Sequence, residues 1–171
     1  GMRGANHQTQ VVTAIPLRCQ QGNVFIYHTA WFTTHLRLQA QILQVAEGYK
    51  EQAVAEAARS TALELRGLGF TWVFAPVADV TIGPADPTIG TRSPAGDPEV
   101  AATATAAAIR GFRDGALIPT AKHYPGHGSV TADSHRALPV QAADLATLRA
   151  RDLKPFVAAV RAGTPAVMMS H

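Results

Sequence analysis

The sequence predicts an α/β fold built on a parallel sheet. From about residue 51 onward, helical and apolar segments alternate in the order helix, strand, loop, helix, strand, loop, helix, strand. Such alternation is typical of parallel βα units. The apolar runs are almost continuous, as expected for strands that are buried on both faces. Polar residues follow these runs directly, where α/β proteins place their chemistry.

Three segments have helical patterns: residues 51–68, 98–112 and 142–162. The first has one apolar face with charged residues elsewhere, which is the amphipathic pattern of a helix packed on a core. Asp97 can cap the second helix and Pro98 fits its first turn. Asp152 and Pro155 indicate that the third helical region stops and restarts midway.

Three apolar runs have the length of strands: residues 70–79, 116–120 and 166–169. The first run ends at Asp79. An acidic residue at the carboxyl end of a strand is a site candidate, and it can equally hold a loop through backbone hydrogen bonds. The following loop is long, and such loops in compact domains are usually functional. Within it, Arg92 can bind a carboxylate or a sugar hydroxyl with its planar fork, or tie the loop together.

Composition indicates a globular domain and argues against several functions. The chain has 171 residues, of which 47% are hydrophobic and 16% charged, with a formal net charge of +3. The arginines are scattered, so no nucleic-acid partner is expected. The single cysteine, Cys19, leaves no disulfide framework and no cysteine-rich zinc site. No apolar run is long enough for a membrane helix. No signal pattern is clear, so the expected location is cytoplasmic, with secretion as the alternative.

The densest group of reactive side chains lies in residues 121–135, which hold histidines, a lysine and an aspartate. The preceding strand is expected to deliver Lys122 and His123 at its carboxyl end, and these offer donors suited to sugar hydroxyls. The loop that follows carries Asp133 and His135. A carboxylate beside an imidazole can fix its tautomer and raise its pKa, which makes a general acid/base.

The same stretch permits a metal-dependent hydrolase as an alternative. His123, His127, Asp133 and His135 are acceptable zinc ligands. The spacing of His123 and His127 would align them on a helix, but Pro125 between them disfavours one. We therefore predict no metal site. His127 can instead line the pocket or brace the loop.

The residues of this stretch resemble a known family. Lys122 to Gly128, followed after four residues by Asp133-Ser134-His135, resembles the signature of glycoside hydrolase family 3, in its β-N-acetylglucosaminidase branch. Residues 72–79 and 89–93 are similar to the strand and arginine loop of that family, and residues 167–171 to a later strand end. We therefore expect two parts: an atypical N-terminal segment, residues 1–50, and a partial catalytic barrel domain, residues 51–171.

The resemblance implies a fold, an activity and residue roles. The fold would be part of a (β/α)8 TIM-type barrel, and the reaction would remove terminal β-linked N-acetylglucosamine with retention of configuration. His135 would be the acid/base and Asp133 would orient it, while Lys122, His123 and Arg92 would bind the sugar. Second-tier site candidates are Asp79, His127 and His171. Substrates would be β-N-acetylglucosaminides, including saccharides derived from peptidoglycan or chitin, and no cofactor is implied.

Two departures from the family pattern set further expectations. The family's aspartate nucleophile follows the segment equivalent to residues 167–171, so we expect it to be absent from this chain. The family's acidic substrate loop precedes the helix at residue 51, yet the first aspartate here is Asp79. A barrel typically needs about 250 residues, so we expect an incomplete one whose open sheet edge invites an oligomer or a complementing chain. An inactive sugar-binding remnant and a β-glucosidase of the same family are the alternative functions.

Overall fold

The computed structural model describes residues 51–132 and 138–170, and the predicted N-terminal segment of residues 1–50 lies outside them. In chain order the elements are α2 (Glu51–Gly67), the 3-10 turns η1 (Gly83–Ala85) and η2 (Gly90–Arg92), α3 (Pro98–Asp114), β1 (Thr120–Tyr124), α4 (Leu145–Ala150), α5 (Lys154–Arg161) and β2 (Ala166–Met169). No helix in the described ranges is long and apolar enough to cross a membrane.

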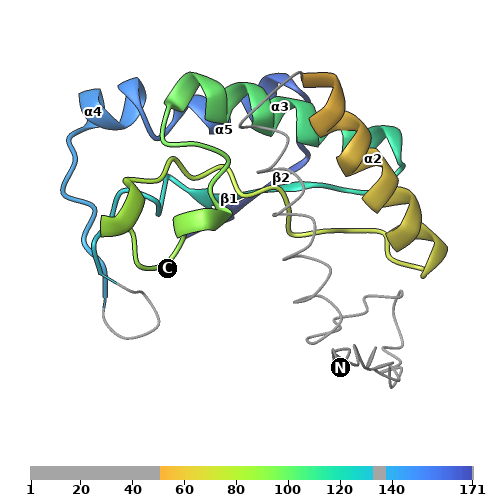
Figure 1. Cartoon of the computed structure of the whole chain (residues 1–171), viewed down its shortest axis with the longest axis horizontal. Coiled ribbons are helices and arrows are strands. Elements are labelled where there is room, and N and C mark those ends of the chain that lie inside the picture. The colour runs from red at the N-terminus through yellow and green to blue at the C-terminus, as the bar shows by residue number, and fades with distance from the viewer. Residues whose placement is uncertain (1–50, 133–137, 171) are drawn as a thin grey trace, which may run out of the picture.

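The extended segments run parallel, which confirms the predicted α/β class. β1 pairs with β2, with Thr120 opposite Ala166 and Lys122 opposite Met168. On its other side, Lys122 of β1 forms an isolated parallel bridge with Val77, and Ile118, just before β1, forms another with Trp72. Helices α2, α3 and α5 lie in one layer along one side of these segments, and α3 packs against both α2 and α5 (Figure 1).

Two predicted strand boundaries were wrong. Residues 70–79 do not form a continuous strand but make only isolated bridges, and Pro76 among them has no N–H to donate. The strand predicted at 116–120 instead spans Thr120–Tyr124. The reason is that α3 continues to Asp114 and a turn follows it, with Ala116 at a φ of 58°. Lys122 and His123 lie in the carboxyl-terminal half of β1, close to the strand end where they were expected.

The helices agree with the sequence patterns because their caps are local. The Asp97 side chain accepts hydrogen bonds from the N–H groups of Glu99 and Val100, at 2.8 and 2.9 Å, and so caps α3. The third helical region divides into α4 and α5, with residues 151–153 between them. Asp144 caps α4 through a 2.7 Å bond from the Thr147 N–H. Pro155 occupies the first turn of α5, where a missing N–H costs nothing.

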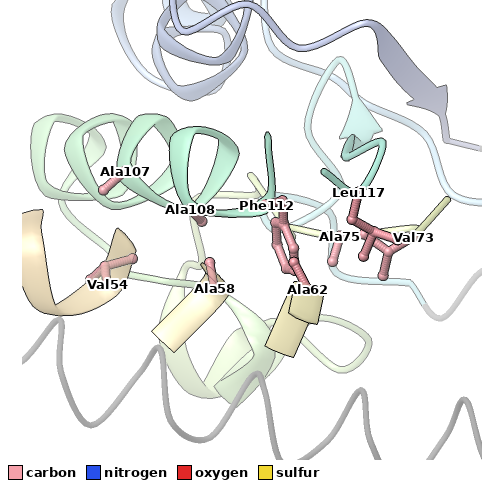
Figure 2. Packing of buried hydrophobic residues seen from close by; sticks show 9 residues of the cluster. All are labelled: Val54, Ala58, Ala62, Val73, Ala75, Ala107, Ala108, Phe112 and Leu117. Atoms are coloured by element: carbon pink, nitrogen blue, oxygen red, sulfur yellow. The ribbon is translucent and has the colours of Figure 1, made fainter. Parts of the chain in front are cut away.

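The main core lies between α2 and α3 and extends onto the first extended segments. Figure 2 shows its buried residues: Val54, Ala58, Ala62, Val73, Ala75, Ala107, Ala108, Phe112 and Leu117. Most are alanines, which lets the two helices approach closely. Gly111 marks the closest approach, because a Cβ placed there would overlap the Ala55 carbonyl oxygen. The two helices can lie this close together because residue 111 has no side chain.

The far side of the described sheet is open. β2 pairs with β1 alone among the described strands. Beside it runs an apolar groove of about 510 Å³, lined by residues of β1, α5 and β2 that include Tyr124, Phe156 and Met169. Met169 is 63% exposed. An apolar strand edge of this kind is what a sheet with a further neighbour would present.

Candidate active site

A buried carboxylate organises the candidate site. Asp79 follows the extended segment beside β1 and is fully buried. Its Oδ1 accepts a hydrogen bond from the His127 N–H at 2.6 Å, and its Oδ2 accepts one from the His123 N–H at 3.2 Å. The same Oδ2 lies 2.7 Å from His123 Nδ1. Asp79 therefore holds a loop through backbone groups, as one of its two interpretations predicts, and also contacts the His123 ring.

This contact assigns the tautomer of His123. A carboxylate oxygen accepts hydrogen bonds, so Nδ1 of His123 is the donor in this contact. The other nitrogen, Nε2, is then an acceptor for a ligand hydroxyl. The side chain of His123 is 16% exposed, which gives a ligand limited access to it. Asp79, which is fully buried, thus holds the His123 ring in one orientation.

Lys122 lies beside this pair and is almost completely buried, with 2% exposure. Its pKa is lowered from 10.5 to about 7, mainly by burial and then by the Arg92 charge, while Asp79 acts in the opposite direction. Both charged neighbours are therefore close enough to act on Lys122. Both backbone groups of Lys122 are bonded to the neighbouring segment. Its N–H donates to the Pro76 carbonyl oxygen, and its carbonyl oxygen accepts from the Ala78 N–H.

The loop that carries Arg92 is built around Asp86. The Asp86 carboxylate accepts hydrogen bonds from Thr81 Oγ1 and from the N–H groups of Thr88, Ile89 and Gly90. Arg92 ends η2, and its Nη2 donates to the Thr88 carbonyl oxygen at 2.6 Å. The Ser93 hydroxyl donates to the Asp79 carbonyl oxygen at 2.7 Å, which anchors the loop to the site. Arg92 thus ties its own loop while its charge reaches Lys122.

His127 lies in the same cluster. It is buried, and its ring meets that of His123 edge-on, with centroids 6.4 Å apart. Gly128 after it packs against Val80, so closely that a Cβ there would approach the Val80 carbonyl oxygen. The loop of residues 126–130 is therefore pressed against the chain that follows Asp79.

The structure brings together Asp79, Arg92, Lys122, His123 and His127. Asp133, His135 and His171 lie outside the described residues. In the ranges 51–132 and 138–170, no group of three or more histidine, cysteine, aspartate or glutamate residues is arranged to hold a metal. The described cluster is therefore a set of hydrogen-bond donors and acceptors around an imidazole with limited exposure, which suits a polyhydroxylated ligand.

Sequence reasoning missed the residues that support this cluster. Gln141 Nε2 donates to Ser129 Oγ at 2.7 Å, which joins the chain on either side of residues 133–137. Asp152 was interpreted only as part of a helix break and Arg151 was not singled out, yet Arg151 contacts the chain after Asp79 and Asp152 contacts Gly126. The signal that could have identified them is the adjacent arginine and aspartate at the break in the third helical region.

Comparison with known proteins gives matches at the level of a family and of individual relatives. The model of the family described as glycosyl hydrolase family 3 N terminal domain matches residues 7–171. A β-hexosaminidase of Stenotrophomonas maltophilia is 43% identical over 124 residues, which are 71% of this chain and 36% of the relative. A β-hexosaminidase of Xanthomonas oryzae is 39% identical over 132 residues, 77% of this chain and 39% of the relative. The chain thus spans a little over a third of these curated relatives.

Solved structures agree in fold. NagZ from Neisseria gonorrhoeae, in complex with N-trifluoroacetyl-D-glucosamine, matches with a TM-score of 0.69 and 35% identity, over 80% of this chain and 40% of that chain. A β-N-acetylglucosaminidase from a Paenibacillus species matches with a TM-score of 0.72 and 39% identity, over 77% of this chain and 24% of that chain.

Proposed function

Since the chain belongs to glycosyl hydrolase family 3, we propose that it is the part of a glycosidase that binds a terminal β-linked N-acetylglucosamine and supplies the acid/base pair for its removal. Its fold is accordingly part of a TIM-type barrel, with the parallel strands and outer helix layer that such a barrel repeats. The relatives named β-hexosaminidase support this choice of reaction.

One observation carries the proposal: His123 is held by Asp79 directly beside the buried Lys122. With its proton on Nδ1, His123 presents Nε2 to accept a hydrogen bond from a sugar hydroxyl. Lys122 and Arg92 offer N–H donors to hydroxyl oxygens, and the Arg92 fork can bridge two of them. The N-acetylated sugar in the complex of the Neisseria relative supports a ligand of this class.

The chemical step is assigned to Asp133 and His135 from their motif. Protonated His135 gives its proton to the leaving oxygen while a carboxylate attacks the anomeric carbon and the glycosidic bond breaks. The neutral imidazole then takes a proton from water, which displaces the carboxylate and releases the sugar. Asp133 stabilises the protonated ring. No cofactor takes part in these steps.

The test of catalysis is the release of aryl groups from aryl β-N-acetylglucosaminides by a full-length form that contains the attacking carboxylate, and by its His135→Ala variant. An acid contributes most when the leaving group is poor. We therefore expect the variant to lose about 100-fold or more in turnover with poor leaving groups and far less with good ones. Equal losses for both kinds of substrate would contradict an acid role for His135.

A second candidate function is sugar binding without turnover. It is favoured by the carboxylates near the described site, which are already engaged: Asp79 by both histidines, Asp86 by its own loop, and Asp152 by Arg151. None of these three is placed to attack a sugar. Calorimetric binding of N-acetylglucosamine with no aryl release would support this function. A preference for glucose would favour a β-glucosidase, and no binding of either sugar would contradict both candidates.

A further inference from the structure

A buried ion pair lies between α4 and α5, behind the candidate site. Arg151 Nη1 donates to Asp152 Oδ1 at 3.0 Å, and the Asp152 side chain is 1% exposed. The other oxygen, Oδ2, has no hydrogen-bond partner among the described residues. Burial raises the pKa of Asp152, while the Ser129 hydrogen bond and the Arg151 charge lower it. Since burying a charged pair rarely adds net stability, helix packing alone does not account for it.

Arg151 contacts the chain that leaves Asp79. Its Nη2 donates to the carbonyl oxygens of Val80 and Thr81, at 3.1 and 3.0 Å. These are the two residues directly after Asp79. The planar guanidinium can satisfy both carbonyls and Asp152 at once, which a lysine could not do. Arg151 therefore fixes the direction of the backbone that directly follows Asp79.

Asp152 contacts the second chain segment that meets Asp79. A Cβ placed on Gly126 would lie 2.7 Å from Asp152 Cβ, so the Asp152 side chain rests directly on the Gly126 backbone. Gly126 has a φ of 130°, which suits glycine alone. The next residue is His127, whose N–H donates to Asp79. The Ile82 N–H, which donates to the Gly128 carbonyl oxygen at 3.0 Å, joins the two segments once more.

We propose that Arg151 and Asp152 are positioning residues for the candidate site, which clamp the segments on either side of the Asp79 carboxylate and thereby set the orientation of His123. The effect on sugar affinity rests on the proposed function. The effect on the His123 ring does not, because it follows from the contacts alone. Neither residue touches the ligand.

The primary test compares Asp152→Ala with Asp152→Asn in the full chain. The imidazole nitrogen resonances of His123, assigned with a His123→Gln variant, report the tautomer, and calorimetry reports the affinity for N-acetylglucosamine. Alanine keeps the Cβ that rests on Gly126 but removes the carboxylate that holds Arg151, so we expect a mixed tautomer and binding weaker by about tenfold or more. Asparagine keeps the acceptor for Arg151 and replaces an oxygen that makes no hydrogen bond, so we expect the Nδ1–H form and affinity within about twofold of wild type.

A second variant covers a failure of Asp152→Ala to fold. Arg151→Met alone would leave the buried Asp152 carboxylate without its charged partner, so Arg151→Met is made together with Asp152→Asn, which removes both charges. The double variant removes the bonds to Val80 and Thr81 and is expected to shift the His123 resonances in the same direction. Asp144→Ala is the matched control, because it weakens α4 at its cap and touches none of the site loops.

The outcomes distinguish the positioning role of Arg151 and Asp152 from the proposed function. Folded Asp152→Ala and double variants with wild-type His123 resonances would overturn the proposal. So would Asp144→Ala if it altered His123 as much as they do. Failure of the wild-type chain to bind the sugar would contradict the proposed function only, and the His123 resonances would still decide on the positioning role.

Discussion

The α2–α3 helix pair and the Asp79 site are built on opposite principles. The helix pair is apolar and consists mostly of alanine, and its geometry follows from close contact between small side chains (Figure 2). The site is a buried group of charged and polar residues held by hydrogen bonds, with Asp79 and Lys122 almost without exposure. The first region gains stability from packing, whereas the second has to offset the desolvation of its charges.

This difference teaches where stability and function are separable. A substitution in the helix pair should change folding without changing the ligand affinity of folded molecules. A substitution at the site should change affinity, with an effect on stability whose sign depends on which charge is removed. The predictions below test that division.

The largest effect is expected for Asp79→Ala. It leaves the N–H groups of His123 and His127 without their buried acceptor and frees the His123 ring. The free energy of unfolding should fall by about 3–5 kcal/mol, and sugar binding should be lost. Denaturant titration and calorimetry measure the two effects. Retention of wild-type affinity by the folded variant would show that Asp79 does not organise the site.

Gly111→Ala tests the helix pair. Its Cβ would overlap the Ala55 carbonyl oxygen, so α2 and α3 must separate. We expect a loss of about 2–3 kcal/mol in the free energy of unfolding, and unchanged affinity for the sugar in the folded fraction. Gly67→Ala is the control, because nothing lies within 4 Å of a Cβ there. Similar losses at both glycines would mean that close packing does not decide the effect.

Lys122 gives a pH signature of the site. Its pKa is about 7 in the folded chain and near 10.5 when unfolded, so between these pH values the unfolded chain binds more protons. Because of Lys122, the free energy of unfolding must therefore rise as the pH rises from about 7 to about 10, by about 1 kcal/mol per pH unit between pH 8 and 9. Below pH 7 the full cost of the buried charge is present.

The measurement is the free energy of unfolding against pH for wild type, Lys122→Met and Lys154→Met. Lys122→Met should lose the positive slope and be more stable than wild type at pH 6. Lys154 pairs with Glu99 at the surface, so its variant should keep the wild-type slope. A slope that survives in Lys122→Met must come from other groups and would contradict the burial cost assigned here.

The smallest effects are expected at the helix caps. Asp97→Ala removes the bonds to the N–H groups of Glu99 and Val100 and should cost about 1 kcal/mol of stability without changing sugar affinity. Thermal unfolding followed by circular dichroism measures it. A change in affinity would mean that α3 and the site are coupled more tightly than their contacts indicate.

The difference between helices set by local signals and a site built from distant contacts also explains what the sequence could predict. The helices and β2 follow from periodicity and caps within a few residues, as with Asp97 for α3. The family resemblance grouped Arg92, Lys122 and His123, and the position of Asp79 at the carboxyl end of a predicted strand made it a candidate for the same edge. The interrupted strand at Pro76 and the support from Arg151 could not be found this way, because they depend on contacts such as Arg151 with Val80, 71 positions apart.

The central claim is that the buried Lys122 and the oriented His123 bind a terminal N-acetylglucosamine. Calorimetric titration of N-acetylglucosamine into wild type, Lys122→Met and Lys154→Met at pH 6 tests it most directly. We predict that wild type and Lys154→Met bind equally well and that Lys122→Met, although folded and more stable, binds about 100-fold more weakly or not at all. Equal binding by all three proteins, or binding by none, would contradict the claim.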